Sequence, residues 1–262
     1  MDQNLLDKVM KQVSSELGLN KEPEQTTNEC GNNNVGMTEF VGTAGGDTIG
    51  LVIANVDPLL KEKMNLGNYR SIGIFGGRCG AGPQIWAVDE AIKATNTEVI
   101  SVELPRDTKG GAGHGSYILI GADDVSDARR AVEIALNVLP KYFGDVYENT
   151  AGHIEFQYTA RASQCLEVAL GAQNGRAFGM TCAGPAAIGA VLADVAVKAA
   201  NVEVIGYSSP CNGGTSFSNE VILTFTGDSG AVRQAVRAAI EAGKKLLGAL
   251  GEEPKSGSQP YI

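Results

Sequence analysis

Hydrophobic side chains recur at steps of three and four positions between residues 5 and 17, with charged or polar residues between them. This spacing predicts an amphipathic helix of about three and a half turns. Residues 18–36 have almost no hydrophobic side chains and no periodicity, which predicts a flexible linker. An isolated helix this short is marginally stable in water, so we expect its hydrophobic stripe to pack on a second protein or on the chain's own globular part. The stripe consists of Leu5, Leu6, Val9, Met10, Val13 and Leu17.

The chain after the linker is a repeat with a period of about 105 residues. Residues 89–101 align without gaps on residues 194–206, with identical residues at eight of thirteen positions. Shorter matches lie upstream: an Ala-Gly-Pro tripeptide at 81–83 and 183–185, and the pattern Glu-Phe-x-x-Thr-Ala at 39–44 and 155–160. Two copies therefore fill the chain after the linker.

Both copies predict the same elements in the same order: a strand, a helix, a second strand, a polar glycine-rich loop, a third strand and a last helix. The strands are expected at residues 71–75, 98–103 and 117–120 in the first copy and at 177–181, 203–207 and 221–225 in the second, and the last helices are expected to begin at Asp124 and Asp228. The first copy carries an additional helix-like segment at 58–64. Strands joined by loops as well as helices favour α+β domains with largely antiparallel sheets. We therefore predict a helix and linker at 1–38 and domains at 39–150 and 151–262.

Composition narrows the possible functions. The hydrophobic fraction of 43% permits a packed core, and the formal net charge is −9 without a run of Lys or Arg. Nucleic-acid binding is not expected, because its affinity comes largely from clustered cations. The longest uncharged stretch, residues 177–193, contains Pro185 and is too short for a membrane span, which needs about 20 apolar residues.

The five cysteines are Cys30, Cys79, Cys165, Cys182 and Cys211. Their number is odd, no two form a Cys-x-x-Cys pair, and the polar N-terminus does not look like a signal peptide. Reduced thiols and a cytoplasmic location are therefore expected.

Two segments of the second copy, residues 198–207 and 226–233, resemble the signature of a bacterial microcompartment shell domain. The tandem arrangement resembles circularly permuted, trimer-forming members of that family. Further segments resemble a shell protein of propanediol-utilisation compartments, with an ethanol-utilisation type as the alternative; these are residues 39–44, 51–55, 103–115, 207–210 and 214–219.

The resemblance implies two ferredoxin-like domains, each an antiparallel sheet with flanking helices. It also implies a structural shell protein in the cytoplasm rather than an enzyme, without a cofactor. The expected partners are two further copies in a homotrimer, other shell proteins, and the encapsulated enzyme core, which the helix at residues 5–17 would attach.

Two glycine-rich loops are candidates for the lining of a channel. Their Ser, Thr and Asn side chains offer hydrogen bonds to a small polar solute, although ordinary surface loops have the same composition. The resemblance implies that these loops face the central pore of the ring, where a small diol or glycerol would pass. The candidate residues are Gly110, Gly111, Gly113, His114, Gly115, Gly213, Gly214, Thr215, Ser216, Ser218 and Asn219.

A Lys-x-x-Asn pair occurs at the predicted junction of helix and strand in both copies: Lys93 with Asn96, and Lys198 with Asn201. Such pairs are ordinarily solvated surface. The resemblance implies that they lie at the outer edge, where neighbouring rings meet. A Pro-Arg-Pro edge motif of single-domain relatives is missing.

Three alternatives remain open. Residues 73–82 form a glycine-rich turn between a strand and a helix, the setting of a dinucleotide site in an oxidoreductase, but the spacing is not Gly-x-Gly-x-x-Gly. Three symmetry copies of Cys211 could hold an iron–sulfur cluster, although clusters usually take four thiolates. Cys79 or Cys165 could pair with a histidine, but nothing in their spacing predicts it. We expect no catalytic residues and no metal.

Overall fold

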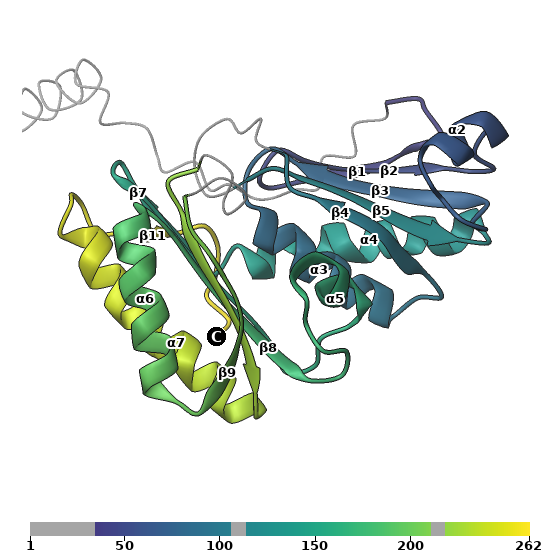
Figure 1. The fold of residues 1–262 in the computed structure, drawn as a ribbon. Coiled ribbons are helices and arrows are strands. Elements are labelled where there is room, and N and C mark those ends of the chain that lie inside the picture. Colours follow the sequence, from purple (N-terminus) through teal and green to yellow (C-terminus); the bar gives the residue numbers. More distant parts are fainter. Residues whose placement is uncertain (1–34, 106–113, 211–217) are drawn as a thin grey trace, which may run out of the picture.

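The computed structural model describes residues 35–105, 114–210 and 218–262. In this part of the chain two antiparallel sheets follow one another, and helices pack against each (Figure 1). The predicted α+β fold of two tandem domains is therefore confirmed. The predicted helix at 5–17 and most of the predicted linker lie outside the described residues.

The first sheet has the strand order β1-β2-β3-β5-β4. Its strands are β1 (Phe40–Ala44), β2 (Thr48–Ile53), β3 (Ser71–Gly77), β4 (Glu98–Glu103) and β5 (Ser116–Ala122). The helices of this domain are α2 (Pro58–Lys63), α3 (Ala81–Lys93) and α4 (Val125–Tyr142). The helix-like segment expected at 58–64 is α2.

The helix α4 covers one face of this sheet, and two glycines let it approach. A Cβ atom at Gly50 would lie 2.4 Å from Val132 Cγ1, and one at Gly73 would lie 2.8 Å from Val132 Cγ2. Val132 and Leu136 of α4 enter the hydrophobic core through this close contact.

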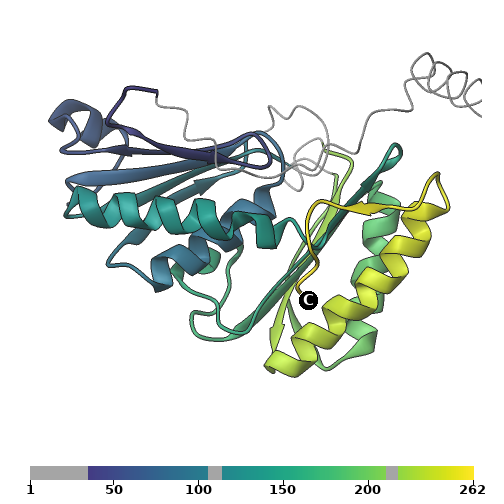
Figure 2. The ribbon, with the colours of Figure 1, turned by 180° about the vertical axis from the view of Figure 1, so that it is seen from behind.

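The second sheet has the order β11-β6-β7-β8-β10-β9. Its strands are β6 (Val146–Asn149), β7 (Gly152–Thr159), β8 (Ala177–Gly184), β9 (Val202–Ser208), β10 (Val221–Gly227) and β11 (Lys255–Ser256). The helices are α5 (Gln164–Leu170), α6 (Ala186–Ala199) and α7 (Ser229–Gly248). Figures 1 and 2 show α6 and α7 on the face of this sheet that is turned away from the first domain. No helix in the described ranges is long and apolar enough to cross a membrane.

Two details of the predicted repeat are wrong. The pattern at 39–44 lies on the edge strand β1, whereas its match at 155–160 lies on β7, which corresponds in sheet order to β2. The tripeptide at 81–83 opens α3, whereas Ala183 and Gly184 end β8. A sequence match of three to six residues is compatible with several strand or turn positions, so it does not determine which elements of the two copies are equivalent. In addition, β6 pairs with β7 although it lies before the expected boundary at 150/151.

The helix α3 lies between the two domains. Its residues from Ala81 to Asp89 are all buried, because it contacts α4 and β3 on one side and α5 and β7 on the other. Trp86 of α3 stacks on Phe178 of β8, with 6.0 Å between ring centroids. One hydrophobic core therefore continues from the first domain to the free face of the second sheet.

A buried carboxylate fastens this junction. The backbone N–H of Ser163 donates to Asp89 Oδ1 at 2.9 Å, and the Ser163 hydroxyl donates to the same oxygen at 2.5 Å. Lys93 Nζ lies 2.6 Å from Asp89 Oδ2 and 3.4 Å from Thr159 Oγ1. The fully buried charge of Asp89 is thus neutralised within the chain.

Candidate functional site

The second sheet turns a row of polar side chains towards the first domain. On β7, His153, Glu155 and Gln157 alternate with Ile154 and Phe156. Successive side chains of a strand point to opposite faces, and the two hydrophobic residues belong to the core under α6 and α7. The three polar residues are all buried, on the face that meets α3.

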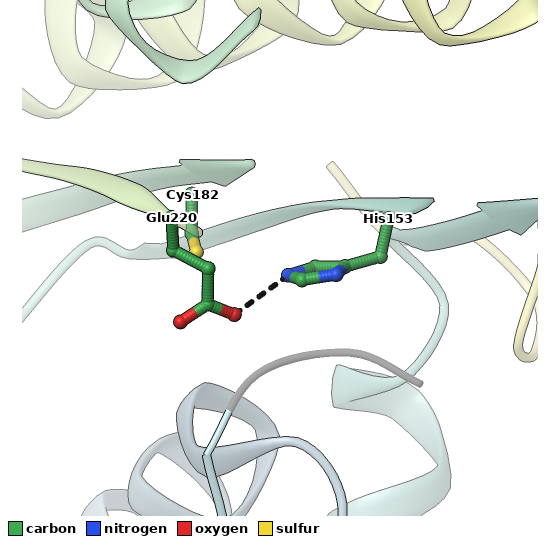
Figure 3. A group of neighbouring side chains, drawn as sticks. All are labelled: His153, Cys182 and Glu220. Atoms are coloured by element: carbon green, nitrogen blue, oxygen red, sulfur yellow. Dashed lines mark ion pairs between the residues drawn. The ribbon is translucent and has the colours of Figure 1, made fainter. Parts of the chain in front are cut away.

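Neighbouring strands bring two further groups to this row. Cys182 of β8 is opposite Glu155, and Glu220 directly precedes β10. His153 Nε2 lies 2.9 Å from Glu220 Oε1, and the donor atoms of His153, Cys182 and Glu220 all lie within 4.8 Å of one another. Figure 3 shows these three side chains leaving the sheet on the same side. A side chain at Gly184 would crowd His153 and Glu220, because its Cβ would lie 3.1 Å from His153 Cε1 and 3.5 Å from Glu220 Cγ.

The first domain completes the cluster. His114, which precedes β5, places Nδ1 at 3.2 Å from Glu220 Oε2. Gly82 in the first turn of α3 makes room for Glu155, since a Cβ there would lie 1.7 Å from Glu155 Oε1. A cavity of about 30 Å³ lies at this junction and is lined by His114, Glu155, Cys182 and Glu220 among others. This volume is enough for one water molecule.

Burial and neighbouring charges set the protonation of the cluster. Burial raises the pKa of Glu155 to about 7, with His153 opposing the shift. Burial raises the pKa of the Cys182 thiol well above its usual value, and the carboxylates of Glu220 and Glu155 add to this. Burial would also raise the pKa of Glu220, but hydrogen bonds from His114, His153 and Ser218 and the charge of His153 outweigh it and lower that pKa. The junction therefore holds one carboxylate tied to two imidazoles, beside a neutral thiol.

The two candidate channel loops meet at their described ends. His114 is the second-last residue of the first loop and Glu220 follows the second, so their contact joins the loops across the domain junction. Asn219 Oδ1 accepts a hydrogen bond from the backbone N–H of Ala186, which caps α6. Gly115 is buried against Pro105. The candidates Gly110, Gly111, Gly113, Gly213, Gly214, Thr215 and Ser216 lie outside the described residues, as does Cys211.

The structure brings a cysteine to a histidine, but not one of the two considered from the sequence. Cys182 lies beside His153, whereas the buried thiol of Cys165 donates to the backbone oxygen of Ile85, at 3.5 Å. Cys79 precedes α3, where its backbone oxygen accepts from Gln84 Nε2.

The two Lys-x-x-Asn pairs lie in different surroundings. The Lys93 side chain is 24% exposed and is held by Asp89 at the domain junction. The Lys198 side chain is 73% exposed, and its ion pair with Asp194 is a surface one. Asn96 and Asn201 are both exposed. The assignment of both pairs to the outer edge of the ring stays a prediction. Of the two lysines, only Lys198 has a single, exposed ion-pair partner, whereas Lys93 is bound to the buried Asp89.

The glycine-rich turn at 73–82 is filled by the protein itself. Gln84 Nε2 donates to Thr48 Oγ1 and to the backbone oxygen of Cys79, each at 2.9 Å. A Cβ at Gly77 would lie 2.7 Å from that same amide nitrogen. Because the first turn of α3 is also buried by the second domain, these glycines serve packing rather than the close approach of a pyrophosphate.

Sequence reasoning did not single out Glu155, Cys182 or Glu220 as site residues. One signal was available: polar residues at 153, 155 and 157 alternate with hydrophobic ones on a strand. Such an alternation predicts a polar face. It does not predict that a second domain buries that face, because burial here comes from contacts across the repeat.

Comparison with known proteins identifies the class. The BMC domain family model matches residues 71–154 and 177–251, starting at the equivalent strands β3 and β8. The chain therefore belongs to the BMC-domain family of bacterial microcompartment shell proteins. It is 58% identical to the bacterial microcompartment shell protein PduB of Citrobacter freundii over 98% of both chains.

Two crystal structures agree with this classification. A trimeric bacterial microcompartment shell protein PduB superposes with a TM-score of 0.83 at 55% identity, covering 86% of this chain and all of that one. EtuB from Clostridium kluyveri superposes with a TM-score of 0.84 at 58% identity, covering 86% and 99%. The predicted shell-protein family, its tandem domains and a structural rather than enzymatic function are thereby confirmed, as is the location in a microcompartment shell.

Proposed function

We propose that the chain forms a pseudohexagonal homotrimer that tiles the shell of a propanediol-utilisation compartment together with other shell proteins. The observation that carries this proposal is the difference in burial between two equivalent helices. In α3, eleven of thirteen residues are buried, because the second domain covers it. In α6, only five of fourteen are buried, although Asp194 and Lys198 are its only charged residues. The exposed apolar side of α6, which includes Val191, would be covered by the first domain of the next protomer.

A second pair of equivalent helices supports the same assembly. In α5, the second and third residues are Cys165 and Leu166, both fully buried against the first domain. In α2, the residues at these positions are Leu59 and Leu60, which are 77% and 46% exposed. Exposed leucines whose counterparts are core residues indicate an interface between copies of the chain. The edge strand β9 of the next protomer, where Val204 is 50% exposed, would accept α2 as β4 accepts α5.

We place the contact between trimers at Lys198 and Asn201. The lysine can lay its stem along a neighbouring trimer and donate to backbone oxygens there. Lys198→Ala is expected to leave the trimer intact and to abolish extended sheets in negative-stain images of the purified protein. Val125→Ala, which trims an exposed residue at the start of α4, is the control and should form sheets. Sheets of normal order from Lys198→Ala would contradict the edge assignment.

A channel for small polar solutes such as a diol or glycerol is proposed at the two glycine-rich loops. Support comes from the contact of His114 with Glu220, which holds the described ends of both loops at one place. The neutral Ser, Thr and Asn side chains in the loops would exchange hydrogen bonds with hydroxyl groups.

The segment at residues 5–17 is proposed to attach the encapsulated enzyme core. Its hydrophobic stripe and the polar residues 18–36 suit a tethered helix that folds on a partner. Deleting residues 1–36 is expected to preserve the trimer and to remove enzyme cargo from shells recovered by pull-down. Leu6→Glu with Val13→Glu should act likewise, because the charges oppose burial of the stripe. Lys8→Glu, on the polar side, is the matched control. Equal cargo recovery from all variants would show that the helix packs on its own chain.

A further inference from the structure

The cluster at the domain junction contains the donor set of a transition-metal site. Imidazole nitrogen, thiolate sulfur and carboxylate oxygen are all established zinc ligands. His153, Cys182 and Glu220 supply one of each within 4.8 Å, from adjacent strands of one sheet. A tetrahedral zinc with bonds of about 2.0–2.3 Å would need these atoms roughly 3.3–3.8 Å apart, so small side-chain rotations suffice.

We propose that His153, Cys182 and Glu220 bind one Zn²⁺ ion per chain at the junction of the two domains. The ion displaces the thiol proton of Cys182 and the proton that His153 Nε2 shares with Glu220 Oε1, and both protons are released to solvent. It separates these two atoms, which lie 2.9 Å apart without it. This inference is independent of the proposed tiling and transport.

Three surrounding features suit the ion. The absence of a side chain at Gly184 leaves room beside His153 and Glu220. The cavity of about 30 Å³ beside Cys182 and Glu220 has room for a water molecule as the fourth ligand. Leu104, which also lines the cavity, is 36% exposed.

Two further groups lie beside the proposed ligands, one that orients Glu220 and one that can add negative charge. His114 Nδ1, 3.2 Å from Glu220 Oε2, holds the second oxygen of the carboxylate, as outer groups in metal sites commonly do. Glu155 Oε1 accepts no hydrogen bond from the described residues, although it is buried. A cation at this position would compensate a carboxyl group that now lacks a partner for one oxygen.

The test uses the full-length protein, stripped with a chelator and titrated with Co²⁺ and then with Zn²⁺. We expect one Co²⁺ per chain with a thiolate-to-cobalt charge-transfer band, its displacement by Zn²⁺, and a rise in the thermal unfolding midpoint. Cys182→Ala should abolish the band and weaken binding by at least about tenfold. Cys165→Ala, which removes an equally buried thiol, should keep the charge-transfer band and the affinity for cobalt.

Additional variants keep the proposal falsifiable if Cys182→Ala does not fold. His153→Gln and Glu220→Gln should change the cobalt spectrum and weaken binding, whereas Cys211→Ser should not. Absence of binding to the wild-type protein, a band that survives Cys182→Ala, or a band lost in Cys211→Ser would each overturn the assignment.

Discussion

Leu59→Asp is expected to convert the trimer into monomers. In α2 this side chain is 77% exposed, and its counterpart Cys165 is fully buried. A carboxylate forced into that contact would lose its hydration without a partner, which should raise the dissociation constant by at least about a hundredfold. The fold of the single chain should not suffer, because an acidic residue in the first turn of a helix is favourable. Native mass spectrometry over a range of concentrations measures this directly.

A matched control separates this contact from a general effect of surface charge. Leu250 lies just beyond α7, outside α2 and α6, and is 56% exposed. Leu250→Asp should therefore leave the trimer unchanged. If both variants remain trimeric, α2 is not part of the interface between protomers.

Lys93→Ala is expected to destabilise the protein, whereas Lys198→Ala is not, although the two lysines occupy the same place in the repeat. Removing Lys93 leaves the buried carboxylate of Asp89 with Ser163 as its remaining partner. Allowing for the 24% exposure of the lysine, we expect a loss of about 2 kcal/mol in the free energy of unfolding. The exposed pair of Lys198 with Asp194 should cost less than about 0.5 kcal/mol.

Calorimetry of the two variants shows the difference as a shift of about 5 °C in the unfolding midpoint for Lys93→Ala. Asp89→Asn with Lys93→Ala is the control, because the double variant has no buried charge to leave unpaired and should recover part of the loss. Equal midpoints for Lys93→Ala and Lys198→Ala would show that the junction does not depend on this ion pair.

Much of the fold was predictable from the sequence because each element carries its own local pattern. The strand at 98–103 and the caps at Asp124 and Asp228 have their expected bounds. The correspondence between β1 and β7 was wrong because a six-residue match records an extended conformation and not a place in the sheet order. Pairing across the sheet decides that place, and no local pattern records it.

The candidate site was less predictable. His153 reaches Glu220 through the strand order of the second sheet, whereas only the packing of one domain on the other brings His114 to the same carboxylate. The same packing explains why Lys93 is held at a junction while Lys198 is exposed, although the two lysines lie in segments that are identical at eight of thirteen positions. Properties that arise between the copies cannot be predicted from either copy alone.

The joining of two domains in one chain also sets how often any chemical group recurs around a ring. In the second copy, Glu155 of β7 pairs with Cys182 of β8. The equivalent pair in the first copy is Ile49 of β2 with Gly76 of β3. A ring of six identical single-domain subunits would carry every side chain six times. In the proposed trimer, a thiol, two carboxyl groups and two imidazoles would occur at three alternate seams, whereas the strand positions equivalent to Glu155 and Cys182 carry an isoleucine and a glycine at the other three. Duplication therefore allows a near-sixfold tile to keep its outline while half of its seams acquire a chemistry that the other half lacks.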